Sequence, residues 1–342
     1  MTRALPRLLR LGLLLPLVMG LAGGCQHPAG GKPVVLETVQ APSAALLPPA
    51  KSSLTLLQWN VGYAGLGKDA DFKADGGKRI LPPSKQSVDR NLGGITSRLK
   101  SLEADIYLFQ ELARPSLLTY GRDVVAQVAA SLPGTLMMFS ADIDHGLPRL
   151  KHGLGVASRV GLEGQRLVRL PDEPKRTAGF IARRYHVQVL DLRVADEPWT
   201  LIHLHLSAFD SGSVRDAQFQ AVLKLAEEAF GRGHHVVVLG DWNMRFAPTQ
   251  FPYTAEPAAQ FWIRDLPLSS IPSGWHLVFD PRTPSVRTNE QAYVAGRNYT
   301  TIIDGALVSP GVELVSVTTS DTGFVDTDHQ PVRYVLRAKP KD

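Results

Sequence analysis

The feature that most constrains the fold is an aliphatic run at residues 236–239 that leads directly into the sequence GDWN at 240–243. An apolar run of this kind predicts a buried strand. Side chains on a strand alternate between its two faces, so Asp241 and Asn243 should point the same way from its end. Such a pair can orient a water and a phosphate oxygen, or bind a cation that prefers oxygen. Asp and Asn are also common in turns, so this pattern alone leaves a simple Gly-Asp turn equally open.

Polar residues follow apolar stretches at five further places along the chain. The full set is Gln58-Trp59-Asn60, Gln110-Glu111, His205-Leu206-Ser207, Asp241-Trp242-Asn243, Ile303-Asp304-Gly305 and Asp328-His329-Gln330-Pro331. Carboxylates can hold a metal ion, amides can orient a substrate, and imidazoles can move protons. Together the segments predict a hydrolytic metal site built from strand ends.

Strands dominate the predicted secondary structure, with helices interspersed. We expect strands at 54–59, 106–109, 154–157, 183–192, 200–206, 236–239, 301–308 and 332–336, and helices from Ser84 onward and at 214–230. Residues 61–83 are rich in Gly and end in Pro82-Pro83, which predicts a long loop. The 342 residues are 44% hydrophobic and 20% charged, a composition typical of a folded soluble protein. Because the motifs extend from Asn60 to His329, one large domain is favoured over two.

Residues 1–24 have the pattern of a signal peptide: arginines, an apolar stretch at 11–19, and small residues before Cys25. Cys25 is the only cysteine, and residues 21–25 resemble a bacterial lipobox, in which the cysteine is lipidated. We expect an extracytoplasmic lipoprotein, anchored in the outer membrane of a bacterium because Gln26 follows the cysteine. The alternative is an ordinary secretory signal, with Cys25 incidental and the protein secreted.

Residues 25–52 are rich in Pro, Ala and Gly and predict a flexible tether, which leaves 53–340 as the catalytic domain. Loss of the leader removes three arginines and no acids, so the net charge of +5 becomes +2. The mature charge is therefore weak support for a nucleic-acid partner.

The ordered set QWN, FQE, HLHLS, GDWN, IDGALVS and TDHQPV resembles the endonuclease/exonuclease/phosphatase superfamily, which includes DNase I. The resemblance spans residues 54–336, nearly all of the mature chain. It implies an α/β fold in which two sheets form a sandwich flanked by helices, with the active site at one end. It also implies a divalent metal, usually Mg²⁺, with Mn²⁺ or Ca²⁺ as alternatives.

The resemblance assigns a role to each motif residue. Glu111 matches the principal metal ligand, Asn60 the amide beside the metal, and Asp328 a second acid near it. Asp241 matches the residue that orients the attacking water, and Asn243 one that binds the scissile phosphate.

Two histidines complete this set. His329 matches a histidine paired with an acid, here Asp304, and an Asp–His pair fixes the imidazole tautomer. His205 fits a histidine that donates to the phosphate or helps the leaving group. His203 lies on the same strand face and is expected to be a packed or surface residue.

Secondary candidates for substrate binding are His152, Arg287 and Asn298. His152 lies in a Gly-rich segment that resembles one near the family's site, and the other two precede the strand that carries Asp304. Arg183-Arg184 could bind phosphate, but a solvated pair on a strand is the preferred interpretation. Asp75 could be a second acid or a turn former, and the turn former is the preferred interpretation.

The function expected from the resemblance is a metal-dependent phosphodiesterase, with nucleases included. The alternative is a phosphatase or a phospholipase C- or sphingomyelinase-like enzyme that acts on lipid or inositol phosphates. A third hypothesis, a tethered binding protein without activity, leaves the complete set of catalytic residues unexplained. The expected partners are the phosphate-ester substrate and, through the lipid anchor only, a membrane; no protein partner is expected.

Overall fold

The computed structural model describes residues 34–49, 52–145, 149–172, 183–208 and 212–340. The predicted signal peptide and Cys25 lie outside these residues. Residues Val34–Asp342 form one compact unit. Within the described residues, no helix is long and apolar enough to cross a membrane.

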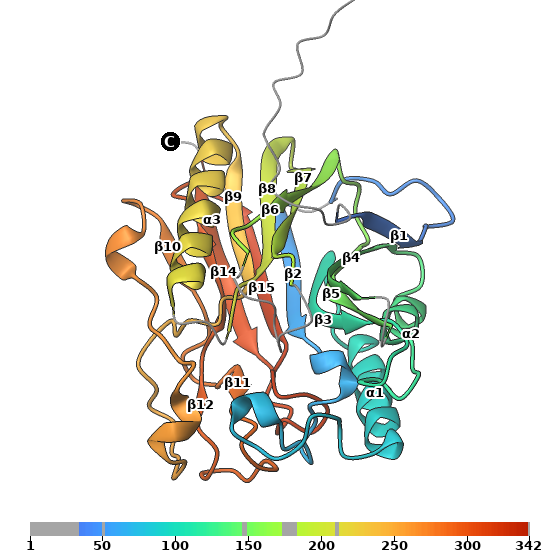
Figure 1. The fold of residues 1–342 in the computed structure, drawn as a ribbon. Coiled ribbons are helices and arrows are strands. Elements are labelled where there is room, and N and C mark those ends of the chain that lie inside the picture. The colour runs from blue at the N-terminus through green and yellow to red at the C-terminus, as the bar shows by residue number, and fades with distance from the viewer. Residues whose placement is uncertain (1–33, 50–51, 146–148, 173–182, 209–211, 341–342) are drawn as a thin grey trace, which may run out of the picture. The chain divides into compact units, whose positions relative to one another are not determined.

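Two mixed sheets form the core of this unit (Figure 1). The first has the strand order β1-β4-β5-β3-β2-β15-β14, and the second has the order β10-β13-β9-β8-β7-β6. A separate pair, β11 and β12, is antiparallel. The strands are β1 Leu36–Gln40, β2 Ser53–Asn60, β3 Ile106–Ala113, β4 Leu136–His145, β5 Leu150–Ser158, β6 Gly164–Arg169, β7 His186–Val194, β8 Glu197–His205, β9 His235–Asp241, β10 His276–Val278, β11 Val286–Arg287, β12 Thr300–Thr301, β13 Asp304–Val308, β14 Val312–Thr319 and β15 Val332–Ala338.

Alternation along the central strands explains why their sequences are apolar throughout. Leu56 of β2 and Val237 of β9 belong to the cluster between the sheets, whereas their neighbours Leu57 and Val238 pack toward helices on the outer faces. A strand buried on both faces has no solvated side to carry polar residues. The expected two-sheet α/β sandwich is therefore confirmed.

Within the part of the chain that the structure describes, three α-helices cover the outer faces of the sheets. Helix α1 (Lys85–Leu99) and helix α2 (Val124–Ser131) share a hydrophobic cluster with the first sheet, and α3 (Ser213–Gly231) shares one with the second. Helix α1 begins with a capping box in which Ser84 and Ser87 exchange hydrogen bonds. Short 3₁₀ helices interrupt the loops: η1 Gly62–Ala64, η2 Lys73–Asp75, η3 Pro257–Gln260 and η4 Leu268–Ser270.

Part of the segment predicted to be a flexible tether is a strand. Leu36–Gln40 forms β1, which pairs with β4 at the edge of the first sheet. Leu36 packs against the cluster between the sheets and Val39 against the helical cluster, so alternate residues are buried on opposite faces. The tether prediction is wrong for these residues because this burial outweighs the Pro- and Gly-rich composition around them.

The strand that ends at Asp241 requires glycine at its penultimate position. Gly240 has φ of 149°, and a methyl group there would come within 2.0 Å of the Leu204 carbonyl oxygen. We expect Gly240→Ala to lower the free energy of unfolding by about 1–3 kcal/mol or more, because the neighbouring backbone cannot yield. Urea unfolding measures this change.

Gly93→Ala is the control, at an exposed position of α1 with no atom near the added methyl group. It should raise the free energy of unfolding by about 0.5–1 kcal/mol. Unfolding of Gly240→Ala at the wild-type urea concentration would contradict the close approach of the two strands.

Candidate active site

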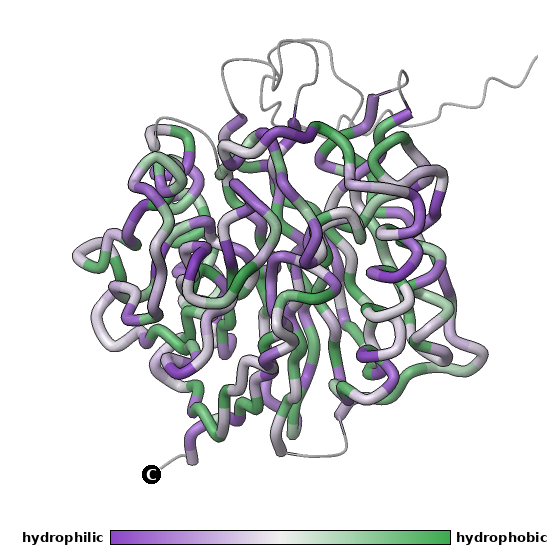
Figure 2. The backbone as a smooth tube through the Cα atoms, turned by 90° about the horizontal axis from the view of Figure 1, so that it is seen from below, coloured by the Kyte–Doolittle hydropathy of each residue, from purple (hydrophilic) through white to green (hydrophobic). Residues whose placement is uncertain are grey.

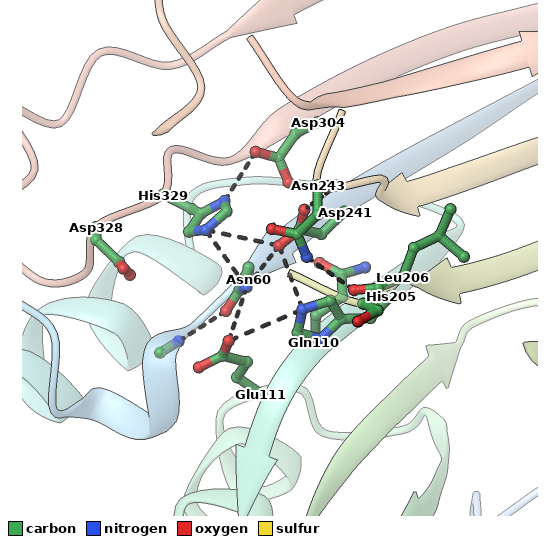
Figure 3. Close-up of polar contacts among 12 residues, drawn as sticks. Asn60, Gln110, Glu111, His205, Leu206, Asp241, Asn243, Asp304, Asp328 and His329 are labelled. Carbon is green, nitrogen blue, oxygen red and sulfur yellow. Dashed lines mark hydrogen bonds and ion pairs between the residues drawn. The ribbon is translucent and has the colours of Figure 1, made fainter. Parts of the chain in front are cut away.

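Two parallel strand pairs bring the polar strand ends together. In the first sheet β2 and β3 are parallel, with Asn60 opposite Gln110 and Glu111 next along β3. In the second sheet β8 and β9 are parallel, with His205 opposite Asp241. Strand β13 runs antiparallel to β9 and places Asp304 opposite the same Asp241. The carboxyl ends of both parallel pairs therefore meet at one place (Figure 3).

Asn60 lies at the centre of this arrangement (Figure 3). Its Nδ2 donates to Asp241 Oδ2 at 3.0 Å and to Glu111 Oε1 at 3.3 Å, and its Oδ1 accepts from the Gly62 N–H at 3.0 Å. These contacts fix which end of the amide faces the carboxylates. The side chain therefore joins an acid of the first sheet to an acid of the second.

His329 lies between two carboxylates. Its Nδ1 is 2.8 Å from Asp304 Oδ2, and its Nε2 is 3.6 Å from Asp241 Oδ2. Asp304 also accepts hydrogen bonds from Gln58 and Ser285, which hold it in place. Burial lowers the pKa of His329, but Asp304 and Asp241 outweigh burial and raise the pKa well above its ordinary value. For Asp241, burial is the dominant cause and raises the pKa to about 7.

Glu111 occupies a strained backbone position. Its φ is 56°, in a bulge of β3 where the register with β5 shifts. A non-glycine residue with positive φ is uncommon and is often found at functional sites. Burial raises the pKa of Glu111, but contact with His152 and the positive charges around it outweigh burial and lower the pKa to about 2. The carboxylate is therefore ionised and faces the pocket.

Asp328 and Asp75 lie on either side of Asn289. The Asn289 amide nitrogen donates to Asp328 at 2.7 Å and to Asp75 at 2.9 Å. Burial raises the pKa of both acids, that of Asp75 to about 7. Asp75 does lie in the turn η2, but its side chain is buried and lines the pocket. The interpretation of Asp75 as only a turn former is therefore wrong.

Arg183 lies in the site, so the preferred interpretation of it as part of a solvated pair is wrong. Its side chain is only 13% exposed and its Nε donates to Asp142 at 2.7 Å. A terminal nitrogen of the guanidinium lies 3.0 Å from His205 Nδ1. Arginine can only donate, so His205 Nδ1 must accept and Nε2 must carry the hydrogen. That Nε2–H faces Asp241 at 3.5 Å and Glu111 at 3.9 Å.

The electrostatic surroundings of His205 favour the neutral imidazole that this tautomer requires. Burial and the charge of Arg183 lower the pKa of His205 well below its ordinary value. His203, two residues earlier, is a core residue as expected, with hydrogen bonds to Gln110 and Gln188. Burial lowers the pKa of His203 to about 3.

Of the three secondary candidates, His152 and Arg287 line the pocket, and His152 is the one beside Glu111. Its Nε2 is 3.7 Å from Glu111, and its Nδ1 is 3.1 Å from Asp142. Burial lowers the pKa of His152, but Asp142 and Glu111 outweigh it and raise the pKa to about 9.

Arg287 and Asn298 are engaged by backbone groups of the protein, and their expected substrate contacts stay a prediction. Arg287 is fully buried, and its guanidinium donates to the backbone carbonyls of Leu66, Gly67 and Thr288. The Asn298 amide is likewise used on backbone groups of its own loop. Both side chains hold loops, because a buried carbonyl needs a donor where no strand supplies one.

One pocket of about 480 Å³ collects the functional side chains. Those that line it include Glu111, His152, Arg183, His205, Asp241, Asn243, Asp328 and His329. Asn60 and Asp304 are buried beneath them. Sequence reasoning missed the positions of Asp142, Arg183 and Asn289, since each is meaningful only through a partner far away in the chain.

Carboxylate, amide and imidazole groups at the end of a two-sheet α/β sandwich define a phosphoesterase-type hydrolase. Residues 57–329 match the Endonuclease/Exonuclease/phosphatase family, and since this is most of the chain, the protein belongs to that family. Members of the family are phosphoesterase hydrolases. No curated protein sequence matches the chain.

Solved structures with low sequence identity share the fold. An endonuclease/exonuclease/phosphatase from Beutenbergia cavernae aligns with a TM-score of 0.55 and 19% identity, covering 84% of this chain and 72% of its own. One from Bacteroides vulgatus aligns with a TM-score of 0.55 and 14% identity, covering 84% of this chain and 100% of its own. TDP2 from D. rerio, complexed with a single-stranded DNA product, aligns with a TM-score of 0.54 and 16% identity, covering 84% and 99%.

Arg183 should determine the tautomer of His205. In long-range ¹H–¹⁵N spectra of labelled protein, we expect the wild type to show the Nε2–H form alone. Arg183→Met removes the donor to Nδ1 and should give a mixture of both neutral tautomers. Arg184→Met is the matched control, because Arg184 does not line the pocket. A single Nε2–H tautomer in folded Arg183→Met would show that another group orients the ring.

Proposed function

We propose that the protein is a divalent-metal-dependent phosphodiesterase that hydrolyses its substrate by in-line attack of water on phosphorus. The observation that carries this proposal is the meeting of Glu111, Asp241 and His329 in one pocket, linked through Asn60. Ionised and neutral groups lie side by side there. A binding protein without activity has no need for a buried acid whose pKa is raised to about 7.

Each residue then has a defined task. Asp241 accepts the proton of the attacking water, for which a pKa near neutral pH is suited. Asn243 also has a left-handed backbone, with φ of 51°, and its side chain donates to the Leu206 carbonyl, which fixes the amide toward the phosphate. His329, held by Asp304, stabilises the charge that develops on phosphate oxygens. His205 presents its Nε2–H to the same region as a donor.

Glu111 and Asp328 would hold the metal. Asn60 directs its NH2 group to Glu111 and its oxygen to the Gly62 N–H, so its part would be to orient the Glu111 carboxylate. Burial raises the pKa of Asp328, and the negative charge of Glu111 raises it further. A divalent cation bound between the two carboxylates would relieve this repulsion. When bound, the metal would neutralise phosphate oxygens and polarise the phosphorus centre. Metal use is common to the family; the choice of Mg²⁺ over Mn²⁺ or Ca²⁺ is part of the proposal.

A second metal position is geometrically available but less suitable. Asp241, Asp304 and His329 have ligand atoms within 4.8 Å of one another. However, Asp304 already accepts from Gln58, Ser285 and His329. A cation there would displace these hydrogen bonds, whereas Glu111 has an oxygen that faces the pocket. We therefore place the metal at the Glu111 side.

Two substrate classes are compatible with the proposed phosphodiesterase. A nucleic acid is supported by family membership and by the DNA product bound to the D. rerio relative. A lipid or inositol phosphate ester is the alternative. The lipid anchor at Cys25 and an outer-membrane location remain part of the proposal, as does the part of the predicted 25–52 tether that precedes β1. Residues 1–33 lie outside those described.

Removal of the metal ligand should abolish activity. We expect Glu111→Gln to lower kcat/KM for a generic diester, bis-p-nitrophenyl phosphate, by about 10²–10³-fold at saturating Mg²⁺. Glu111→Gln should also need a higher concentration of Mg²⁺ for its half-maximal rate. Chelation of the metal should abolish the activity of the wild type. Glu103→Gln, at an exposed position, is the control. Full activity of Glu111→Gln, or of the metal-free wild type, would refute the proposed metal site.

The negative charge of Asp304 beside His329 should contribute to kcat, in addition to holding the imidazole in position. Asp304→Asn keeps the shape but removes the negative charge beside Nδ1, so kcat should fall by roughly 10²–10⁴-fold. Single-turnover experiments with saturating enzyme measure this rate constant on bis-p-nitrophenyl phosphate. Asp321→Asn, at an exposed turn, should change nothing. An unaltered kcat in folded Asp304→Asn would remove the pair from the mechanism.

A further inference from the structure

The pocket changes character from its base to its mouth. The base carries the acids and imidazoles described above, whereas the mouth is formed by apolar side chains of two loops. Ile80 and Leu81 belong to the loop that follows β2, and Leu117 belongs to the loop that follows β3; all three line the pocket. Seen from below, the backbone tube carries both hydrophobic and hydrophilic segments (Figure 2).

These apolar side chains are unusually exposed for their size. Ile80 is 65% exposed, Leu117 61% and Leu81 39%. Single exposed aliphatic residues are normal on protein surfaces, but several that share the wall of one pocket indicate contact with an apolar ligand. They are also continuous with the place where the phosphate would lie.

The mouth is held in position by its own small core. Tyr63, Leu66 and Ala70 form a buried cluster with Ala113, and Phe72 and Leu118 pack against it. The guanidinium of Arg287 donates to the Leu66 and Gly67 carbonyls and so fixes the loop that follows β2. The exposed apolar residues are therefore presented by an anchored loop.

The described side chains that line the pocket offer few contacts to a long polyanion. Among the described residues that line it, the only arginines are Arg183 and Arg287, and there is no lysine. Arg183 is paired with Asp142, and Arg287 is buried and bonded to carbonyls. Binding of a polynucleotide depends on several phosphate contacts from such side chains. An apolar ester group needs none of them.

We propose that the substrate is an amphipathic phosphodiester, one of whose ester groups is an aliphatic chain held against Ile80, Leu81 and Leu117. This rests on the proposed phosphodiesterase function and specifies its substrate class. The phosphate lies at the polar base, and the chain leaves the pocket along the apolar mouth. The substrate is bound as a single molecule, so recognition does not require a membrane surface.

The experiment compares methyl, butyl and octyl esters of methyl phosphate below the concentration at which they aggregate. Hydrolysis by the full-length protein with Mg²⁺ is followed by ³¹P NMR. Burial of each methylene should raise kcat/KM about fourfold until the chain passes the mouth. Leu117→Asn and Ile80→Asn should flatten this dependence and leave the rate on the methyl ester unchanged. Leu268→Asn, exposed but remote from the pocket, is the matched control.

The outcomes separate the two proposals. Equal rates on all three esters, in wild type and in Leu117→Asn, overturn the apolar subsite and leave the phosphodiesterase intact. No hydrolysis of any ester, of bis-p-nitrophenyl phosphate or of a single-stranded oligonucleotide, with Mg²⁺, Mn²⁺ or Ca²⁺, refutes the phosphodiesterase itself. A chain-length effect that appears only when the ester is presented in phosphatidylcholine vesicles overturns binding of a single molecule. Faster cleavage of a single-stranded oligonucleotide than of the octyl ester would overturn the substrate class.

Discussion

The hydrogen bond from Asn60 to Asp241 is the contact on which the rest of the site depends, since it joins the two sheets at their polar end. The same amide nitrogen also faces Glu111, and its oxygen is held by the Gly62 N–H. An aspartate in place of Asn60 would add a third negative charge between two acids. An aliphatic residue would leave both acids without a donor, which is costly in a buried site. Only an amide satisfies both neighbours and leaves room for a cation.

The charges of the pocket are arranged in two halves around this amide. On one side His329 lies between two carboxylates, with its Nδ1 2.8 Å from Asp304 and its Nε2 3.6 Å from Asp241. On the other side Glu111 is kept ionised by His152 and by the field of Arg183, and Asp142 balances both of these cations. Each of these buried charges therefore has a partner of opposite charge, which offsets part of the cost of removing it from water.

The sequence predicts the fold and the centre of the site well because both depend on local pattern. The buried strand before Gly240 and the strand that leads to Glu111 are apolar throughout, and their polar ends are unmistakable. The exposed edge strand β14 and the short helix α2 have no such signal, since β14 has few buried residues and α2 is only two turns long. Arg183 and Asp142 were beyond prediction because their pairing links residues 41 positions apart.

The apolar mouth shows how one scaffold can change its substrate without changing its chemistry. The catalytic side chains come from strand ends and from the segments that follow β9 and precede β15, whereas Ile80 and Leu117 come from other loops, after β2 and β3. Replacement of such loop residues alters what the pocket admits and leaves the spacing of the acids intact. The burial of Arg287 fits this division, because an arginine that secures the loop from within is lost to the substrate. Selectivity for the ester group would then reside in the loops and reactivity in the sheets.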